Sequence, residues 1–170
     1  VAGLRLLNRS RGAGTEPLVD VHWALAQIGR RFPSTPVWLV GHSLGGSVAL
    51  RAAGTSRVRG VVALSPWFDG DEDVDQLVGC ASLLVHGADD NVTDPELSRD
   101  YVRRAQDRGA AASLVLVGNG GHGMLRRFGT FHGLCSGFIA AGSGGRRGAS
   151  LGRGGHLAAH LWRNPEMDEV

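Results

Sequence analysis

The chain has 170 residues, of which 42% are hydrophobic, so it is long enough to form one domain with a substantial core. Its 18 basic residues are all arginine, they are scattered, and 16 acidic residues nearly balance them, so we expect no nucleic-acid partner. No leader pattern or membrane-length apolar run occurs, and Cys80 and Cys135 lack Cys-x-x-Cys spacing. We therefore expect a cytoplasmic protein with no membrane partner; the sequence does not indicate an oligomeric state.

The hydrophobic pattern predicts strands that alternate with helices. A short strand is predicted first, over residues 1–8. An amphipathic helix is predicted over 16–31, with an apolar face made of Val19, Trp23, Leu25, Ala26, Ile28 and Phe32. Four further strands are predicted over 37–40, 60–64, 82–86 and 113–117, and three further helices over 44–53, 95–108 and 130–141. Continuous apolar strands are typical of a parallel sheet covered on both faces, so we predict an α/β fold with a mostly parallel sheet of about five strands.

The last part of the sequence has a different composition. Residues 142–155 hold seven glycines and three arginines. We therefore predict one domain over 1–141 and a Gly/Arg-rich flexible tail over 142–170, in which 156–162 could form one or two helical turns.

A serine lies between the strand predicted over 37–40 and the helix predicted over 44–53. The segment Gly41-His42-Ser43-Leu44-Gly45 fits a tight turn that exposes Ser43, with small residues at Gly41 and Gly45 to allow the strained backbone. The same Gly-x-Ser-x-Gly pattern recurs at 148–152, but no apolar strand precedes it and no helical run follows it. The context therefore selects Ser43 as a nucleophile, with the Leu44 amide as an oxyanion donor.

Two later strands lead into loops that carry an acid and a base. The strand over 82–86 precedes Asp89, Asp90 and Asp94, and the strand over 113–117 precedes His122. Carboxyl ends of parallel strands share one edge of the sheet, where a serine needs a base and the base needs an acid. Asp94 is better explained as a helix cap, which leaves Asp89 and Asp90 as candidate acids beside His122.

Five short segments occur in a fixed order: residues 8–12, 41–46, 64–67, 86–90 and 121–122. Together they resemble the α/β-hydrolase superfamily, and more narrowly small lidless bacterial hydrolases of the dienelactone-hydrolase and prolyl-oligopeptidase-like group. The resemblance implies Ser43 as nucleophile, His122 as base and Asp90, the fifth residue of the His-Gly-x-x-Asp segment, as acid.

The resemblance also implies that part of the fold is absent. The strand over 1–8 resembles the fourth strand of that fold, so we expect a partial α/β-hydrolase sheet without strands one to three and without their second oxyanion donor. The third strand of the fold lies between the fourth and the fifth. We therefore expect residues 1–8 either to pair directly with 37–40 or to leave unpaired backbone there.

These observations favour a serine hydrolase that cleaves a small ester, thioester or lactone through an acyl-enzyme on Ser43. We expect His42 and Trp67 in an open substrate pocket, together with Pro66 and Phe68. No cofactor or metal is expected, because the His156 and His160 pair has no further ligand nearby. The alternative is a catalytically impaired, truncated hydrolase remnant that acts, if at all, as a binding protein. A flavodoxin-like binding domain explains the alternating elements but not the Gly-His-Ser turn.

Overall fold

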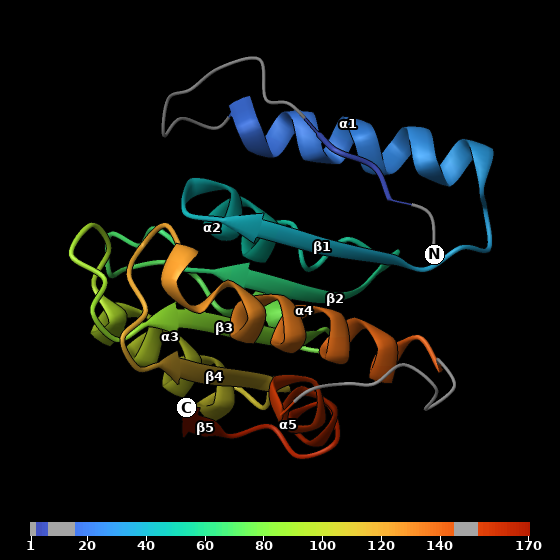
Figure 1. The fold of residues 1–170 in the computed structure, drawn as a ribbon. Helices are drawn as coiled ribbons and strands as arrows, with labels where there is room; N and C mark the ends of the chain where they lie inside the picture. The colour runs from blue at the N-terminus through green and yellow to red at the C-terminus, as the bar shows by residue number, and fades with distance from the viewer. Residues whose placement is uncertain (1–2, 7–15, 145–152) are drawn as a thin grey trace.

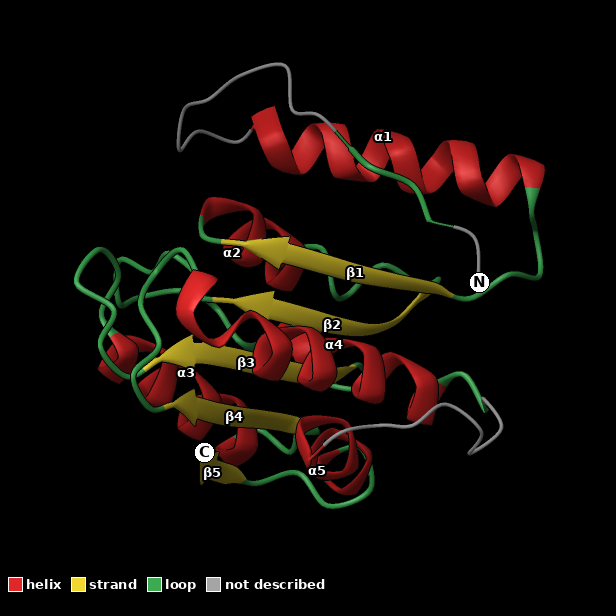
Figure 2. Ribbon diagram, viewed as in Figure 1, coloured by secondary structure: helices red, strands yellow, loops and turns green. Residues whose placement is uncertain are grey.

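A computed structural model describes residues 3–6, 16–144 and 153–170. It contains a five-stranded parallel sheet in the order β1-β2-β3-β4-β5 (Figures 1 and 2). The strands are β1 Val37–His42, β2 Val58–Leu64, β3 Ala81–Gly87, β4 Ala112–Val117 and β5 Met167–Glu169. The helices are α1 Glu16–Arg31, α2 Leu44–Arg51, α3 Pro95–Asp107, α4 Phe128–Gly142 and α5 Arg153–Leu161, with 3₁₀ turns η1 Asp75–Leu77 and η2 Leu125–Arg127. Within these described ranges, no helix is long and apolar enough to cross a membrane.

Helices cover both faces of the sheet, as predicted. Successive side chains of a strand point to opposite faces, and the core accordingly divides into two clusters. Val61 and Leu84 pack with residues of α1, α2 and α3, whereas Val62 and Leu83 pack with residues of α4 and α5. Each central strand is therefore apolar on both sides, which is why it is a continuous hydrophobic run in the sequence.

The strand predicted over 1–8 is wrong where the structure can be compared. Residues 3–6 have no strand, and Leu4 and Leu6 are exposed; residues 1–2 and 7–8 lie outside the described part. Among the described residues, β1 has β2 as its one paired neighbour, so direct pairing with 3–6 does not occur. Because no described strand pairs with the other edge of β1, Val40 is half exposed.

The predicted apolar face of α1 is also only partly buried. Leu25 belongs to the core, but Val19, Trp23 and Phe32 are each more than half exposed. α1 packs against α2 beyond the last paired strand, so among the described residues neighbours cover one side of it only (Figure 1). A helical period identifies an amphipathic helix but does not say how much of the apolar side a neighbour will cover.

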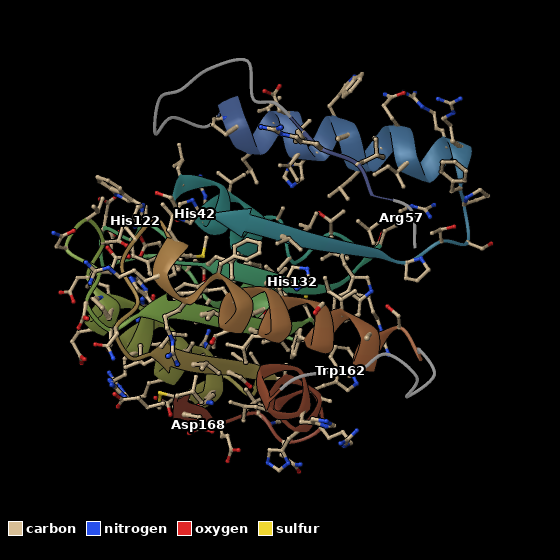
Figure 3. All side chains as sticks on the ribbon, viewed as in Figure 1. His42, Arg57, His122, His132, Trp162 and Asp168 are labelled. Atoms are coloured by element: carbon tan, nitrogen blue, oxygen red, sulfur yellow. The ribbon has the colours of Figure 1, made fainter. Side chains whose placement is uncertain are left out.

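The segment predicted to be a flexible tail contains regular structure. α5 packs against α4, and β5 extends the sheet beside β4, where the Val170 N–H donates to the Leu116 carbonyl at 2.9 Å. Backbone bonds attach β5, whose three side chains are exposed, Asp168 among them (Figure 3), so no apolar pattern marks it. Residues 145–152 lie outside the described part, and the domain boundary at 141/142 stays a prediction.

α4 and α5 cross with glycine against glycine. A Cβ on Gly137 would lie 2.6 Å from the Cα of Gly155, closer than side-chain atoms normally approach. Near this crossing, Trp38 of β1 contacts Phe138 and Trp162, with ring centroids 6.1 and 5.2 Å apart. Gly137 therefore allows the close approach that brings α5 onto this face of the sheet.

We expect Gly137→Ala to lower the free energy of unfolding by about 1–3 kcal/mol, because the added methyl overpacks the crossing. Gly129→Ala in the same helix is the control, since a Cβ there meets no atom within 4 Å. It should be neutral or stabilising, because alanine favours helix over glycine. Urea unfolding of both variants checks this; equal stabilities would contradict the close crossing.

Candidate active site

Ser43 lies at the junction of β1 and α2 with φ 55° and ψ −125°, in the left-handed region that non-glycine residues rarely adopt. The turn is so tight that a Cβ on Gly41 would coincide with the Gly45 carbonyl. A Cβ on Gly46 would press on Pro66 at 3.2 Å, whereas one on Gly45 would meet nothing within 4 Å. The lack of a side chain is therefore needed at Gly41 and Gly46, whereas Gly45 has room for one.

Leu44, the expected oxyanion donor, is the first residue of α2. The amides of Gly46 and Ser47 donate to the Ser43 carbonyl at 2.9 and 3.3 Å. An N–H in the first turn of a helix has no acceptor within the helix and lies at the positive end of the helix dipole. The Leu44 amide is therefore in a suitable place for an anion beside Ser43, and its catalytic role stays a proposal.

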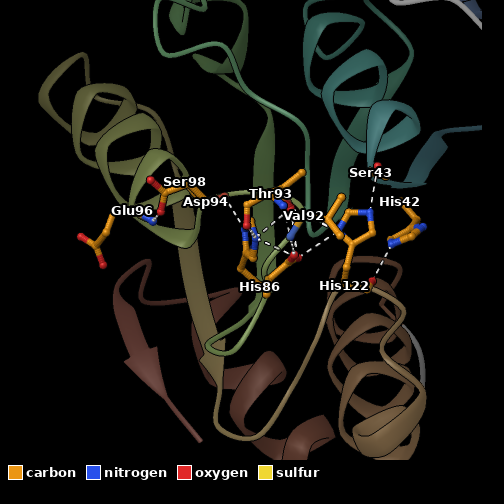
Figure 4. Close-up of polar contacts among 10 residues, drawn as sticks. His42, Ser43, His86, Val92, Thr93, Asp94, Glu96, Ser98 and His122 are labelled. Atoms are coloured by element: carbon orange, nitrogen blue, oxygen red, sulfur yellow. Dashed lines mark hydrogen bonds and ion pairs between the residues drawn. The ribbon is translucent and has the colours of Figure 1, made fainter.

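The structure brings Ser43, His122 and Asp90 together (Figure 4). His122 Nε2 lies 3.1 Å from Ser43 Oγ, and His122 Nδ1 lies 2.9 Å from Asp90 Oδ2. Asp90 has a fully buried side chain, and that of His122 is 18% exposed. Of the competing acids, Asp89 is exposed and Asp94 caps α3 by accepting from the Glu96 N–H at 2.9 Å. The geometry thus selects Asp90.

Two glycines allow the loop that carries Asp90 to lie against the loop that carries His122. A Cβ on Gly87, at the end of β3, would collide with the backbone of Gly120 in the loop after β4. The two loops are also joined by hydrogen bonds from the Ala88 N–H to the Val117 carbonyl and from the Asp89 N–H to the Gly120 carbonyl, both 2.9 Å. Backbone contacts therefore hold Asp90 and His122 at a fixed separation.

The Asp90 carboxylate is surrounded by donors. Oδ1 accepts from the backbone N–H groups of Val92 and Thr93 at 2.9 and 3.0 Å, and Oδ2 accepts from the Thr93 hydroxyl at 3.0 Å as well as from His122. Burial by itself would raise the pKa of Asp90, but these hydrogen bonds outweigh it and hold the pKa well below the usual value. The side chain is an anion at neutral pH, suited to orient a histidine.

A second histidine, His86, contacts the same carboxylate, and sequence analysis missed it. Its side chain is fully buried; Nδ1 lies 2.7 Å from Ser98 Oγ, and Nε2 lies 3.3 Å from both the Thr93 carbonyl and Asp90 Oδ2. Burial lowers the pKa of His86, so the ring is neutral at neutral pH. The sequence feature that could have identified His86 is its position as a titratable residue directly after the apolar run Leu83-Leu84-Val85.

His42, expected in the substrate pocket, is exposed beside the base. Its Nε2 donates to the His122 carbonyl at 2.8 Å, and the two ring centroids are 4.8 Å apart (Figures 3 and 4). A carbonyl only accepts, so the proton of neutral His42 is on Nε2. His42 therefore supports the loop that carries His122.

Of the other expected pocket residues, Trp67 is 46% exposed and its backbone N–H donates to the Ser43 carbonyl at 3.2 Å. Phe68 is buried and stacks on Tyr101 with ring centroids 4.5 Å apart. The prediction that Phe68 lines the pocket is therefore wrong. Neighbouring residues of this extended loop point in different directions, which the sequence does not reveal.

The described part of the chain contains no cluster of three or more histidine, cysteine or acidic side chains suited to a metal ion. His160 instead pairs with Glu166, with Nε2 3.1 Å from the carboxylate, and His156 is exposed. The i, i+4 histidines thus form no metal site in the described residues.

Comparison with known proteins agrees with the fold. Residues 4–80 match the model of the alpha/beta hydrolase family. A putative alpha/beta hydrolase from Agrobacterium tumefaciens is 18% identical, with a TM-score of 0.68 over 84% of this chain and 68% of that one. An alpha-beta serine hydrolase homologue from Coxiella burnetii is 18% identical, with a TM-score of 0.57 over 92% and 61%. A serine hydrolase without a lid from Xanthomonas campestris is 23% identical, with a TM-score of 0.55 over 69% and 52%.

The chain therefore has a partial α/β-hydrolase fold. It spans between 52% and 68% of the length of these three structures. The search of curated proteins found no match.

The buried neutral His86 predicts how stability depends on pH. Its pKa is lowered on folding, so the unfolded chain takes up a proton more readily, and stability falls as the pH drops below the ordinary value of 6.5. His86→Gln has no proton to gain at this position. We expect its unfolding free energy to fall less steeply between pH 7 and 5, by up to about 1.4 kcal/mol per pH unit. Denaturant unfolding at each pH measures both slopes; identical slopes would show that His86 titrates normally.

Proposed function

We propose that the chain is a serine hydrolase that cleaves a small ester, thioester or lactone through an acyl-enzyme on Ser43. The observation that carries this proposal is the unbroken path of contacts from Ser43 Oγ through His122 to the buried Asp90 carboxylate, at 3.1 and 2.9 Å. A serine hydroxyl becomes a useful nucleophile when a base takes its proton and an acid orients that base.

In this mechanism His122 carries its own proton on Nδ1, directed at Asp90, which leaves Nε2 free to accept the Ser43 proton. Oγ then bonds to the substrate carbonyl carbon, and the resulting oxyanion receives the Leu44 N–H. The tetrahedral intermediate collapses, the bond to the leaving group breaks, and the leaving group takes the proton from Nε2. Water, deprotonated by His122, then attacks the acyl carbon. The bond to Ser43 Oγ breaks, Oγ takes the proton back from His122 Nε2, and the acid leaves.

An open site favours a small substrate. The segment between β2 and β3 is too short for a separate cap domain, and the half-exposed Trp67 lies beside Ser43 through its backbone. The similar Xanthomonas structure is itself described as lacking a lid. We propose a small ester-like molecule as partner, without nucleic acid, membrane or cofactor, in the cytoplasm.

Labelling with a fluorophosphonate tests the proposal. We expect the adduct on Ser43, found by peptide mass spectrometry, and no adduct there in Ser43→Ala. His122→Gln and Asp90→Asn should slow labelling about 10²–10⁴-fold, because each removes or misorients the base.

Asp89→Asn is the matched control, since Asp89 neighbours Asp90 in the sequence but has an exposed side chain. It should label at the wild-type rate. A folded wild-type chain that takes no label would refute the proposal and favour the catalytically impaired remnant.

A further inference from the structure

We propose that Thr93 is a positioning residue for the site: its hydroxyl holds the Asp90 carboxylate beside His122, and the buried His86 and Ser98 fix that hydroxyl in turn. The inference rests on the proposed function and adds to it a part that the three-residue description omits.

Thr93 Oγ1 lies where three side chains of the site converge. It is 3.0 Å from Asp90 Oδ2, 3.2 Å from His122 Nδ1 and 3.2 Å from His86 Nε2. Thr93 itself is 7% exposed, so water competes little for these contacts. Figure 4 shows Thr93 between His86 and His122.

Donor and acceptor roles leave one arrangement of protons. The Thr93 carbonyl only accepts, so His86 carries its proton on Nε2, and its bare Nδ1 accepts from the Ser98 hydroxyl at 2.7 Å. His122 carries a proton on Nδ1, directed at Asp90. The single Thr93 hydroxyl proton then has one acceptor, Asp90 Oδ2.

The Thr93 hydroxyl is therefore the point, here called the junction, at which Asp90, His86 and His122 are joined. It donates to the carboxylate while its lone pairs face the Nε2–H of His86 and the Nδ1–H of His122. A rotation of Asp90 away from His122 would break this bond as well as the two backbone bonds to Oδ1. Ser98 lies on α3, and its bond to His86 links the junction to a regular helix. Thr93 thus restricts Asp90 to the orientation in which Oδ2 accepts the hydrogen bond from His122 Nδ1–H.

Two substitutions at position 93 separate the hydroxyl from the shape of the side chain. Thr93→Val keeps the branched shape and removes the hydroxyl, whereas Thr93→Ser keeps the hydroxyl. Thr35→Val, at an exposed threonine, is the matched control. Nitrogen-15 NMR of the histidines follows the tautomer of His122 and its Nδ1–H resonance in each folded protein, and fluorophosphonate labelling follows reactivity at Ser43.

In Thr93→Val, we expect a mixture of His122 tautomers in place of the single Nδ1–H form, because Asp90 is held less firmly beside Nδ1. Labelling should slow about tenfold, the value of one hydrogen bond to a charged group. Thr93→Ser and Thr35→Val should match the wild type. A single Nδ1–H tautomer of His122 in folded Thr93→Val would overturn the inference.

Ser98→Ala tests the same link should Thr93→Val fail to fold. Without the Ser98 hydroxyl, the His86 ring loses its bond to α3 and holds the Thr93 hydroxyl less firmly, so we expect the His122 Nδ1–H resonance in the NMR spectrum to shift. An unchanged Nδ1–H resonance of His122 in folded Ser98→Ala would overturn the role of Ser98. The NMR measurements need no catalysis, so a wild-type chain that takes no label would refute the proposed function and leave the positioning inference to be decided by NMR.

Discussion

The active-site edge of this fold depends on one buried negative charge. The Asp90 side chain is inaccessible to solvent, and an ionised carboxylate in such a place is costly unless donors surround it. The chain meets this requirement locally, with the N–H groups of Val92 and Thr93 and the Thr93 hydroxyl. These donors fix the loop after β3 in one conformation, and that conformation offers Oδ2 to the one ring that arrives from the loop after β4. The position of His122 therefore depends on the hydrogen bonds that fix the Asp90 carboxylate.

The sequence is sufficient to predict the parts of the site that parallel-sheet geometry controls. Continuous apolar runs identify β1 to β4, and the carboxyl ends of such strands lie on one edge. Ser43, Asp90 and His122 each follow one of these strands, so their convergence depends on strand order alone. No comparable rule predicts from the sequence the direction in which a side chain of a loop points. For that reason Phe68 was expected in the pocket and lies in the core, and Thr93 and His86 were not recognised as neighbours of Asp90.

The C-terminal segment is harder to predict because β5 is held by backbone contacts that leave no hydrophobic pattern and α5 begins in a glycine-rich stretch. β5 joins the sheet through its backbone, and α5 packs on α4 where Gly137 meets Gly155. A glycine-rich segment that packs closely against a helix has the same composition as a glycine-rich flexible linker, so composition does not distinguish the two. α1 presents the opposite difficulty: its apolar period is clear, but Trp23 is exposed because no described residue covers that side. Periodicity describes a helix, whereas burial depends on its neighbours.

Ser43, the proposed nucleophile, is the least supported member of the site. Asp90 and His122 follow β3 and β4, and each of these strands is paired on both sides, but Ser43 follows β1, which is paired on one side among the described residues. Two bonds compensate: the Ser43 N–H donates to the Leu64 carbonyl at 2.9 Å, and the Trp67 N–H donates to the Ser43 carbonyl. Both partners belong to β2 and the loop that follows it. The strained Ser43 backbone is therefore maintained by the β1–β2 ladder and by the absence of a side chain at Gly41, so loosening of that edge would move the serine away from His122 before it disturbed the contact between His122 and Asp90.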